Sequence, residues 1–329
     1  MPDGARRMRD ELDKEELLSF IEDHHVIYIR HSMDTTTKVY LKLIRDGTVA
    51  VHYGERLKEG LDSANLKNHE NPENYEGNAR NVLNRLRRHC KNGVVVFADY
   101  SDPPDETIQK AANIGIIPEG ESYKAKRYLG HPDHPGGFVY KQVELRNYKT
   151  LSYADYAPFL AIHPRGGTLS QWKAEKPVKF IYKRELGLSI DPKSINLEVL
   201  FPAQQEVLCS EYLRTKAPDK IKLKHLVLPV GRGMKTVDID GVNERIHLFA
   251  QVSFSQTEEV VKRKTQYLRN LPKGYSGSKE LVQVYFGPIS VKRLIQYIDQ
   301  DIHFVPLEEV FEVMKDTGIL EDMLGMRLD

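Results

Sequence analysis

The chain has 329 residues, of which 40% are hydrophobic and 29% are charged, and its 48 Lys and Arg nearly balance its 47 Asp and Glu. This length and composition predict a folded protein of about two domains, and they exclude disordered, collagen-like and repeat proteins. No apolar run approaches the ~18 residues of a membrane span or the apolar region of a secretion signal. Two cysteines, Cys90 and Cys209, are too few for a disulfide framework or a four-cysteine zinc site. We therefore expect a cytoplasmic protein without a membrane partner.

The N-terminal half is predicted to be rich in β-strands. A short amphipathic helix is expected first, over residues 13–23, and a basic helix over 79–90. Alternating apolar residues predict strands between Val26 and Val51, with a hairpin turn at Asp46-Gly47. Further strands are expected over residues 93–100, 114–117, 123–128 and 138–145, before a loop-like segment that ends at Trp172. We place the domain boundary after residue 175, which gives a β-rich domain of residues 1–175.

The second half, residues 176–329, shows a different order of elements. A helix, three strands, a helix and a strand are expected over residues 202–216, 225–230, 236–242, 245–254, 258–270 and 280–286. Two more helices, over residues 291–300 and 307–324, follow this α-β-β-β-α-β core. The fold class is therefore α+β or α/β with two domains.

Two neighbouring strands of this core carry polar side chains in apolar surroundings. Asp238 and Asp240 are two residues apart, and Gln251 and Ser253 are two apart in the next strand, so each pair points to one face of its strand. Carboxylates grouped in this way suit a hard divalent cation. Metal ligands beside a group that orients water are what phosphodiester hydrolysis requires.

These features resemble the PD-(D/E)XK nuclease superfamily over roughly residues 202–288. The likeness lies in the α-β-β-β-α-β order, the Val-Asp-Ile-Asp-Gly strand and the following Gln-Val-Ser strand. It implies that Asp238, Asp240 and Gln251 hold Mg²⁺ or Mn²⁺ and that Glu206 or Glu211 is the assisting acid on the first helix.

The lysine position of the family motif is occupied by Ser253. Some members of the superfamily carry that lysine on the next helix, where Lys262 and Lys264 are the candidates. Two alternatives follow from this position. With a displaced lysine the protein is a metal-dependent DNA endonuclease, and without one it is a non-catalytic DNA-binding or adaptor protein with a degenerate nuclease fold.

Basic residues are concentrated in the second half and favour a nucleic-acid partner. Between Val178 and His303 they outnumber acidic residues, and clusters of this kind suit phosphate contacts. The candidate DNA-binding residues are Lys220, Lys222, Lys224, Arg232, Lys235 and Arg263. A solvated basic face without a partner is the alternative.

The N-terminal half is faintly similar to PUA-like modules of the EVE and YTH type, which hold a flipped modified base in an aromatic pocket. Candidates for stacking on such a base are Trp172 and the tyrosines Tyr53, Tyr100, Tyr123, Tyr128 and Tyr140. Aromatic residues in a β-rich domain also form its core. A base reader joined to a nuclease would make a modification-dependent restriction or defence enzyme. Cleavage of both DNA strands would require two sites, which makes a homodimer the expected assembly.

Overall fold

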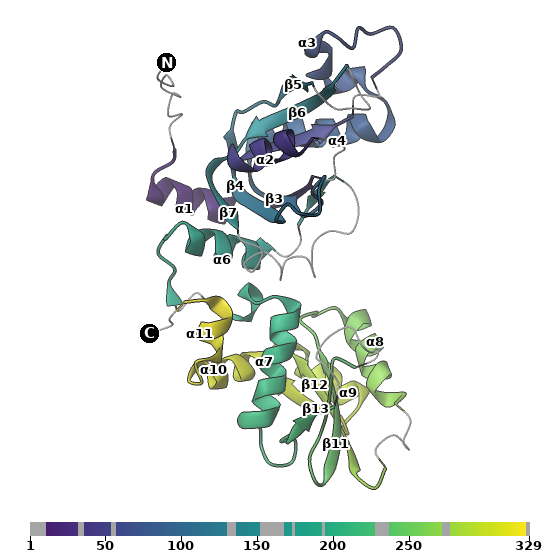
Figure 1. The fold of residues 1–329 in the computed structure, drawn as a ribbon. Coiled ribbons are helices and arrows are strands. Elements are labelled where there is room, and N and C mark those ends of the chain that lie inside the picture. Colours follow the sequence, from purple (N-terminus) through teal and green to yellow (C-terminus); the bar gives the residue numbers. More distant parts are fainter. Residues whose placement is uncertain are drawn as a thin grey trace. The chain divides into compact units, whose positions relative to one another are not determined.

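A computed structural model describes residues 11–31, 36–53, 57–129, 136–151, 168–172, 175–192, 195–227, 237–271 and 277–326. The protein is a mixed α+β structure, as its sequence predicts. Its contacts divide the chain into two compact units, residues 1–190 and 191–329 (Figure 1). Helix α6 (Glu175–Glu185) contacts α1 (Lys14–Asp23) and β1 (Val26–Arg30), so the first unit extends beyond residue 175. Within the described residues, no helix is long and apolar enough to cross a membrane.

The first unit contains two sheets that share one hydrophobic core. The larger sheet has the order β7-β4-β3-β1-β8. In this sheet β1 is parallel to β3, and the other neighbouring strands are antiparallel. The smaller sheet has the order β2-β6-β5. The strands other than β1 are β2 (Thr48–His52), β3 (Gly93–Tyr100), β4 (Ala111–Glu119), β5 (Lys124–Tyr128), β6 (Phe138–Glu144), β7 (Arg146–Leu151) and β8 (Leu169–Gln171). Buried residues of α2 (Thr37–Arg45), α4 (Gly77–Asn92), β2, β3 and β6 form a single cluster, which joins both sheets. A short helix, α3 (Leu66–His69), contacts β5 and β6.

Helix α2 replaces part of the strand pattern expected between Val26 and Val51. Thr36 begins the helix by accepting a hydrogen bond from the Val39 N–H, and Val39 and Leu43 are buried on one helical face. The hairpin predicted at Asp46-Gly47 is also wrong, because β2 pairs with β6. Residues four apart share a face in a helix as well as in a strand, so this short apolar pattern did not distinguish the two.

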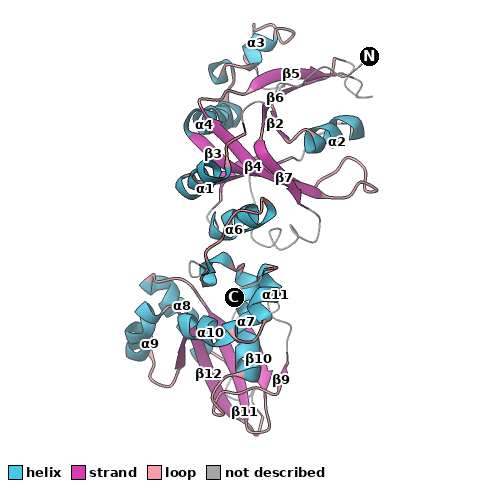
Figure 2. Cartoon of the chain, turned by 90° about the vertical axis from the view of Figure 1, so that its left-hand side faces the viewer, coloured by secondary structure: helices cyan, strands magenta, loops and turns pink. Residues whose placement is uncertain are grey.

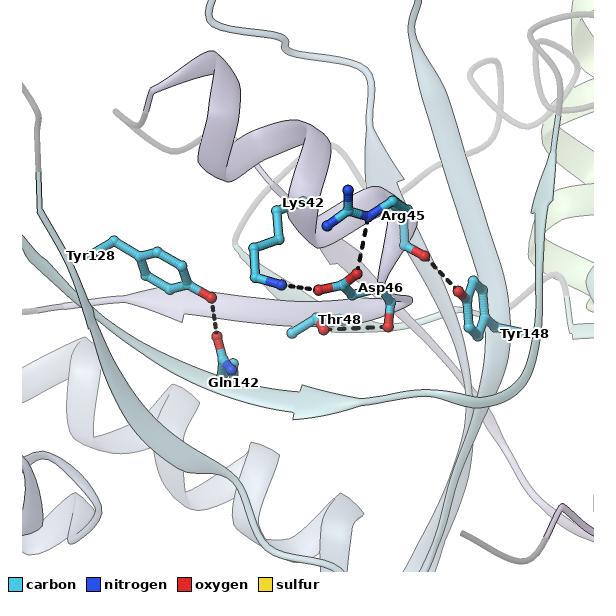
Figure 3. A network of polar contacts seen from close by, with 7 residues as sticks. All are labelled: Lys42, Arg45, Asp46, Thr48, Tyr128, Gln142 and Tyr148. Carbon is cyan, nitrogen blue, oxygen red and sulfur yellow. Dashed lines mark hydrogen bonds and ion pairs between the residues drawn. The ribbon is translucent and has the colours of Figure 1, made fainter. Parts of the chain in front are cut away.

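A polar network closes the tight connection from α2 to β2 (Figure 3). The Asp46 carboxylate pairs with Lys42 and accepts a hydrogen bond from the Arg45 Nε at 3.3 Å. Tyr148 on β7 donates its hydroxyl to the Arg45 carbonyl at 2.6 Å, so its ring lies over the turn. Between them, Gly47 has a φ of +58°, and a Cβ there would lie 2.5 Å from the Cδ1 atom of Tyr148.

We expect Gly47→Ala to destabilise the first unit by about 2–4 kcal/mol, because it combines left-handed backbone strain with a steric clash. Gly120→Ala is the matched control, since Gly120 has a φ of +77° but no atom within 4 Å of an added Cβ. Its cost should be about 1 kcal/mol from the backbone alone. Urea unfolding followed by the fluorescence of Trp172, the single tryptophan, reports on this unit. Equal losses in the two variants would contradict the role of the Tyr148 contact.

The second unit has one sheet, in the order β13-β12-β11-β10-β9. Its first elements are α7 (Pro202–Thr215), β9 (His225–Leu226), β10 (Ile239–Val242), β11 (Ile246–Val252), α8 (Glu258–Arg269) and β12 (Glu280–Gly287), the α-β-β-β-α-β order that the sequence predicts. Strand β10 is antiparallel to both of its neighbours, β9 and β11, whereas β11, β12 and β13 (His303–Pro306) are parallel. Helix α9 (Lys292–Ile298) follows β12, and the helix expected over residues 307–324 is instead α10 (Leu307–Lys315) and α11 (Ile319–Leu324). The break contains Gly318, which has a φ of +75°.

Helices α7 and α8 cover opposite faces of this sheet. Tyr212 of α7 meets the Phe286 ring of β12, with ring centroids 6.3 Å apart. Val261 and Leu268 of α8 instead pack in one cluster with the neighbouring residue of β12, Tyr285. Successive side chains of a strand point to opposite faces of the sheet. A side chain that both helices approach therefore lies at the end of a strand, where it is not confined to one face.

Candidate active site

Asp238 lies where strands β10 and β11 of the sheet in the second unit meet. It directly precedes β10, and because β10 runs antiparallel to β11, it lies beside the C-terminal end of β11. Its N–H donates to the Ala250 carbonyl at 2.9 Å, and its Oδ2 accepts a hydrogen bond from the Val252 N–H at 2.7 Å. The backbone of β11 thus fixes the orientation of this carboxylate.

Lys264 reaches Asp238 from α8. Its Nζ lies 3.2 Å from Asp238 Oδ2 and also donates to the Val252 carbonyl. The two side chains are only 24% and 22% exposed, so solvent screens this ion pair incompletely. Lys262, the other candidate, is 56% exposed and pairs with Glu258 on its own helix. The structure therefore brings Lys264, and not Lys262, to Asp238.

Glu206 reaches the same place from α7, on the other face of the sheet. Burial and, to a smaller extent, the negative charge of Asp238 raise the pKa of Glu206 to about 7, although Lys264 partly opposes these effects. The alternative helix acid, Glu211, forms an ion pair with Arg214 at 2.8 Å instead. Asp238, Lys264 and Glu206 are thus within electrostatic reach of one another although they come from three separate elements.

Gln251, Ser253 and Tyr285 complete the surroundings of Asp238. Gln251 and Ser253 are buried, and Gln251 lies beside Tyr285 in the parallel pairing of β11 with β12. Burial raises the pKa of the Tyr285 hydroxyl; the nearby Ser253 hydroxyl lowers it, and the charge of Asp238 raises it. Sequence analysis did not identify Tyr285, because its proximity depends on the register between two strands that are separated by a helix.

Asp240 belongs to a separate buried pair. Its Oδ1 lies 2.7 Å from the Nε2 of His247 on β11, and both side chains are buried. His247 is therefore a partner that competes with the expected metal site of Asp240 and Asp238. This histidine was not considered in the sequence analysis, although its position seven residues after Asp240 is compatible with a strand pair joined by a short turn.

The oxygen donors of this site suit a hard cation. Asp238, Glu206 and Gln251 offer two carboxylates and one amide, which are ligand types that Mg²⁺ accepts. Within the described ranges, no group of three or more His, Cys, Asp or Glu side chains is arranged to hold a metal ion, so the amide of Gln251 would be needed. Burial and then the negative charge of Asp238 raise the pKa of Glu206, and Lys264 only partly opposes them. A divalent cation at this site would favour the ionised form of Glu206.

The predicted DNA-binding lysines lie away from this site. The Asn243 side chain donates to the Lys222 carbonyl, and Lys224 pairs with Glu244, which places both lysines at the β10–β11 turn. The seven residues of β11 separate that turn from Val252 by about 20 Å. Lys220 is exposed nearby in the chain, and Arg263 is exposed on α8. Arg232 and Lys235 lie outside the described residues.

Trp172 is a core residue of the first unit, which corrects its expected place in a nucleic-acid interface. Its side chain is 2% exposed and packs edge-on against Tyr28 and Phe97. The other tyrosines considered for stacking divide by burial: Tyr100, Tyr123 and Tyr140 are buried, whereas Tyr53 and Tyr128 are partly exposed. The alternative that these aromatic residues form the core is thus correct for Trp172 and these three tyrosines.

Comparisons with protein families, curated proteins and solved structures found no match to this chain.

We expect Glu206 to make the stability of the metal-free protein depend on pH. The folded protein holds this proton up to about pH 7, whereas the ordinary pKa of a glutamate carboxyl is 4.5. The folded state therefore holds more protons between these values, and the contribution of Glu206 to stability falls as pH rises through that window.

Glu206→Gln should remove this dependence and stabilise the protein relative to the wild type at pH 8 more than at pH 5. Urea unfolding in EDTA, followed by far-ultraviolet circular dichroism, measures the difference at each pH. Glu211→Gln is the matched control on the same helix. An effect of Glu206→Gln that is equal at both pH values would contradict the raised pKa.

Proposed function

We propose that the second unit contains a PD-(D/E)XK-like nuclease core over residues 202–288 and that it hydrolyses DNA with Mg²⁺ or Mn²⁺. The observation that carries this proposal is the contact of Lys264 with Asp238. The lysine missing from the Gln251-Val252-Ser253 strand is replaced in space by one from the next helix. The order α7-β9-β10-β11-α8-β12, with its antiparallel strands followed by a parallel one, also supports it.

Each group has a distinct chemical role in this proposal. Asp238, Glu206 and Gln251 supply oxygen ligands from one edge of the sheet. A bound Mg²⁺ would lower the pKa of a water molecule and offset negative charge on the phosphate. Lys264 holds a positive charge beside the same ligands, where it stabilises the charge that develops on the phosphate during attack. Glu206 must lose its proton to act as a ligand, so metal binding, and with it activity, should strengthen as pH rises.

The first unit would select the DNA in this proposal. With Trp172 buried, Tyr53 and Tyr128 are the partly exposed aromatic residues of the predicted set. Recognition of a modified base, a role in restriction or defence, and a homodimer that cuts both strands stay predictions.

The test is cleavage of unmodified and base-modified plasmids by the purified full chain in Mg²⁺ or Mn²⁺, with EDTA as the control. We expect Lys264→Met to lower the cleavage rate by about 100-fold or more, because it removes a charge aimed at the reacting phosphate. Lys262→Met is the matched control, since this lysine lies two residues away and pairs with Glu258. Asp238→Asn should abolish cleavage. Equal activity of the two lysine variants would contradict the proposed site.

The alternative is a non-catalytic DNA-binding or adaptor protein. Ser253 in the motif position favours this alternative. The ion pair of Lys264 with Asp238 also favours it, because it compensates the carboxylate charge without a metal ion. The two functions differ in their response to metal. A ligand that binds only the folded state raises the unfolding temperature, so a nuclease site should show an Mg²⁺-dependent rise at pH 8 that Asp238→Asn removes. DNA binding without this rise and without cleavage would favour the alternative.

A further inference from the structure

Tyr297 is the most exposed large hydrophobic residue in the described part of the chain. It lies on α9, and its side chain is 88% exposed. Helix α9 lies beside α8 in both views of the fold (Figures 1 and 2), and the two helices are in contact. Their packing is secured by Arg269 of α8, whose Nε lies 2.6 Å from Asp299 Oδ2 just after α9. Tyr297 is therefore an aromatic side chain that projects from a well-anchored pair of helices.

Basic side chains surround this ring. Glu258 raises the pKa of Lys262, and Tyr297 adds to this effect, which places the tyrosine hydroxyl near the Lys262 ammonium. Arg293 precedes Tyr297 by four residues, so the two are neighbours on one face of α9. The exposed cations of the two helices are Lys262, Arg263, Arg269, Lys292 and Arg293, and the exposed acids are Glu258 and Glu259. Among the described residues, neither Arg263 nor Arg293 forms an ion pair, so both remain available to phosphates.

An exposed aromatic ring among cations matches the chemistry of an unpaired nucleotide. Its base can stack on the ring while its phosphate contacts the neighbouring cations, and such stacking tolerates any base. In an intact duplex the base faces are covered by their neighbours. The ring therefore favours a single strand, a flap or an extruded base over paired DNA.

The position of this surface relates it to the candidate active site. Helix α8 carries Lys264, which contacts Asp238, and it also carries Lys262 and Arg263, which are exposed. A strand that contacts the outer side of α8 would thus lie close to the groups proposed to cut it. The lysines at the β10–β11 turn, about 20 Å away along β11, have no such connection.

We infer that the exposed side of α8 and α9 is a contact surface for an unpaired nucleic-acid strand, with Tyr297 stacking on one base. The statement that this strand is also the substrate rests on the proposed function. Binding itself does not require cleavage, so the two can be tested apart.

The experiment measures binding of the full chain to fluorescently labelled single-stranded, flapped and duplex DNA by anisotropy, in EDTA so that no cleavage occurs. Tyr297→Ala should weaken binding of the single strand by about tenfold, which is within the range of one lost stacking contact. Tyr297→Phe should retain the affinity, because it keeps the ring. Duplex binding should change little in both variants.

Charge variants separate stacking from phosphate contacts. Arg263→Gln should reduce the salt dependence of single-strand binding by about one counterion, whereas Tyr297→Ala should leave that dependence unchanged. Lys222, at the opposite end of β11, is one of the DNA-binding candidates from the sequence, so Lys222→Gln tests that competing surface and should reduce single-strand affinity less than Arg263→Gln does. The inference is overturned if Tyr297→Ala binds single strands as the wild type does, if Tyr297→Phe is equally weakened, or if Lys222→Gln causes the larger loss.

The outcome for this surface and the outcome for the nuclease are independent. Weakened binding by Tyr297→Ala in a protein that never cleaves DNA would support the surface and reject the proposed activity. Cleavage that requires Lys264 but is accompanied by unchanged binding of Tyr297→Ala would support the nuclease and reject the surface. A Tyr297 that instead binds a protein partner would leave DNA affinity unchanged and would also overturn the inference.

Discussion

Strand β11 is the constraint on which the second unit depends. It is buried along its whole length and pairs with antiparallel β10 on one side and parallel β12 on the other. This pairing brings the start of β10 and the C-terminal end of β11 to one edge of the sheet. Asp238 and Gln251 meet there although thirteen positions separate them in the chain, and the Val252 N–H orients the Asp238 carboxylate. Because ladder hydrogen bonds set the register, a shift of one residue would turn Gln251 to the other face.

The same edge is where helices on opposite faces can approach one side chain. Glu206 comes from α7 and Lys264 from α8, and both act on Asp238. Glu206 retains its proton well above the usual range of a carboxyl pKa, mainly because it is buried and also because it lies near the charge of Asp238. Perturbed acids of this kind concentrate at functional sites, where the cost of burial serves binding or chemistry. The buried pair of Asp240 and His247 shows the contrasting case, in which an acid is matched by its neighbour within the core.

Long periodic segments were predicted well, and short ones were not. Strand β3 and the α-β-β-β-α-β order of the second unit are supported by extended apolar patterns bounded by turn or capping residues, and they occur where expected. The apolar pattern predicts a strand where α2 lies, because Val39 and Leu43 are four residues apart and so share a face in a helix as well as in a strand. The helix begins where Thr36 caps it. Strand β8 has only three residues, and it pairs with β1, which lies far away in the sequence. No local pattern therefore predicts this strand.

The sequence by itself determined the kinds of chemical groups that this protein contains and the local elements that carry them, because side-chain type and apolar period are local properties. It identified Asp238, Gln251 and a basic helix after β11 as the groups of interest. The folded structure alone distinguishes Lys264 from Lys262 and Glu206 from Glu211, and it alone shows that Trp172 is buried and Tyr297 is exposed. Each of these choices depends on which side of a helix or strand faces the sheet and on what packs against it. That information exists only once distant segments have assembled around a common core.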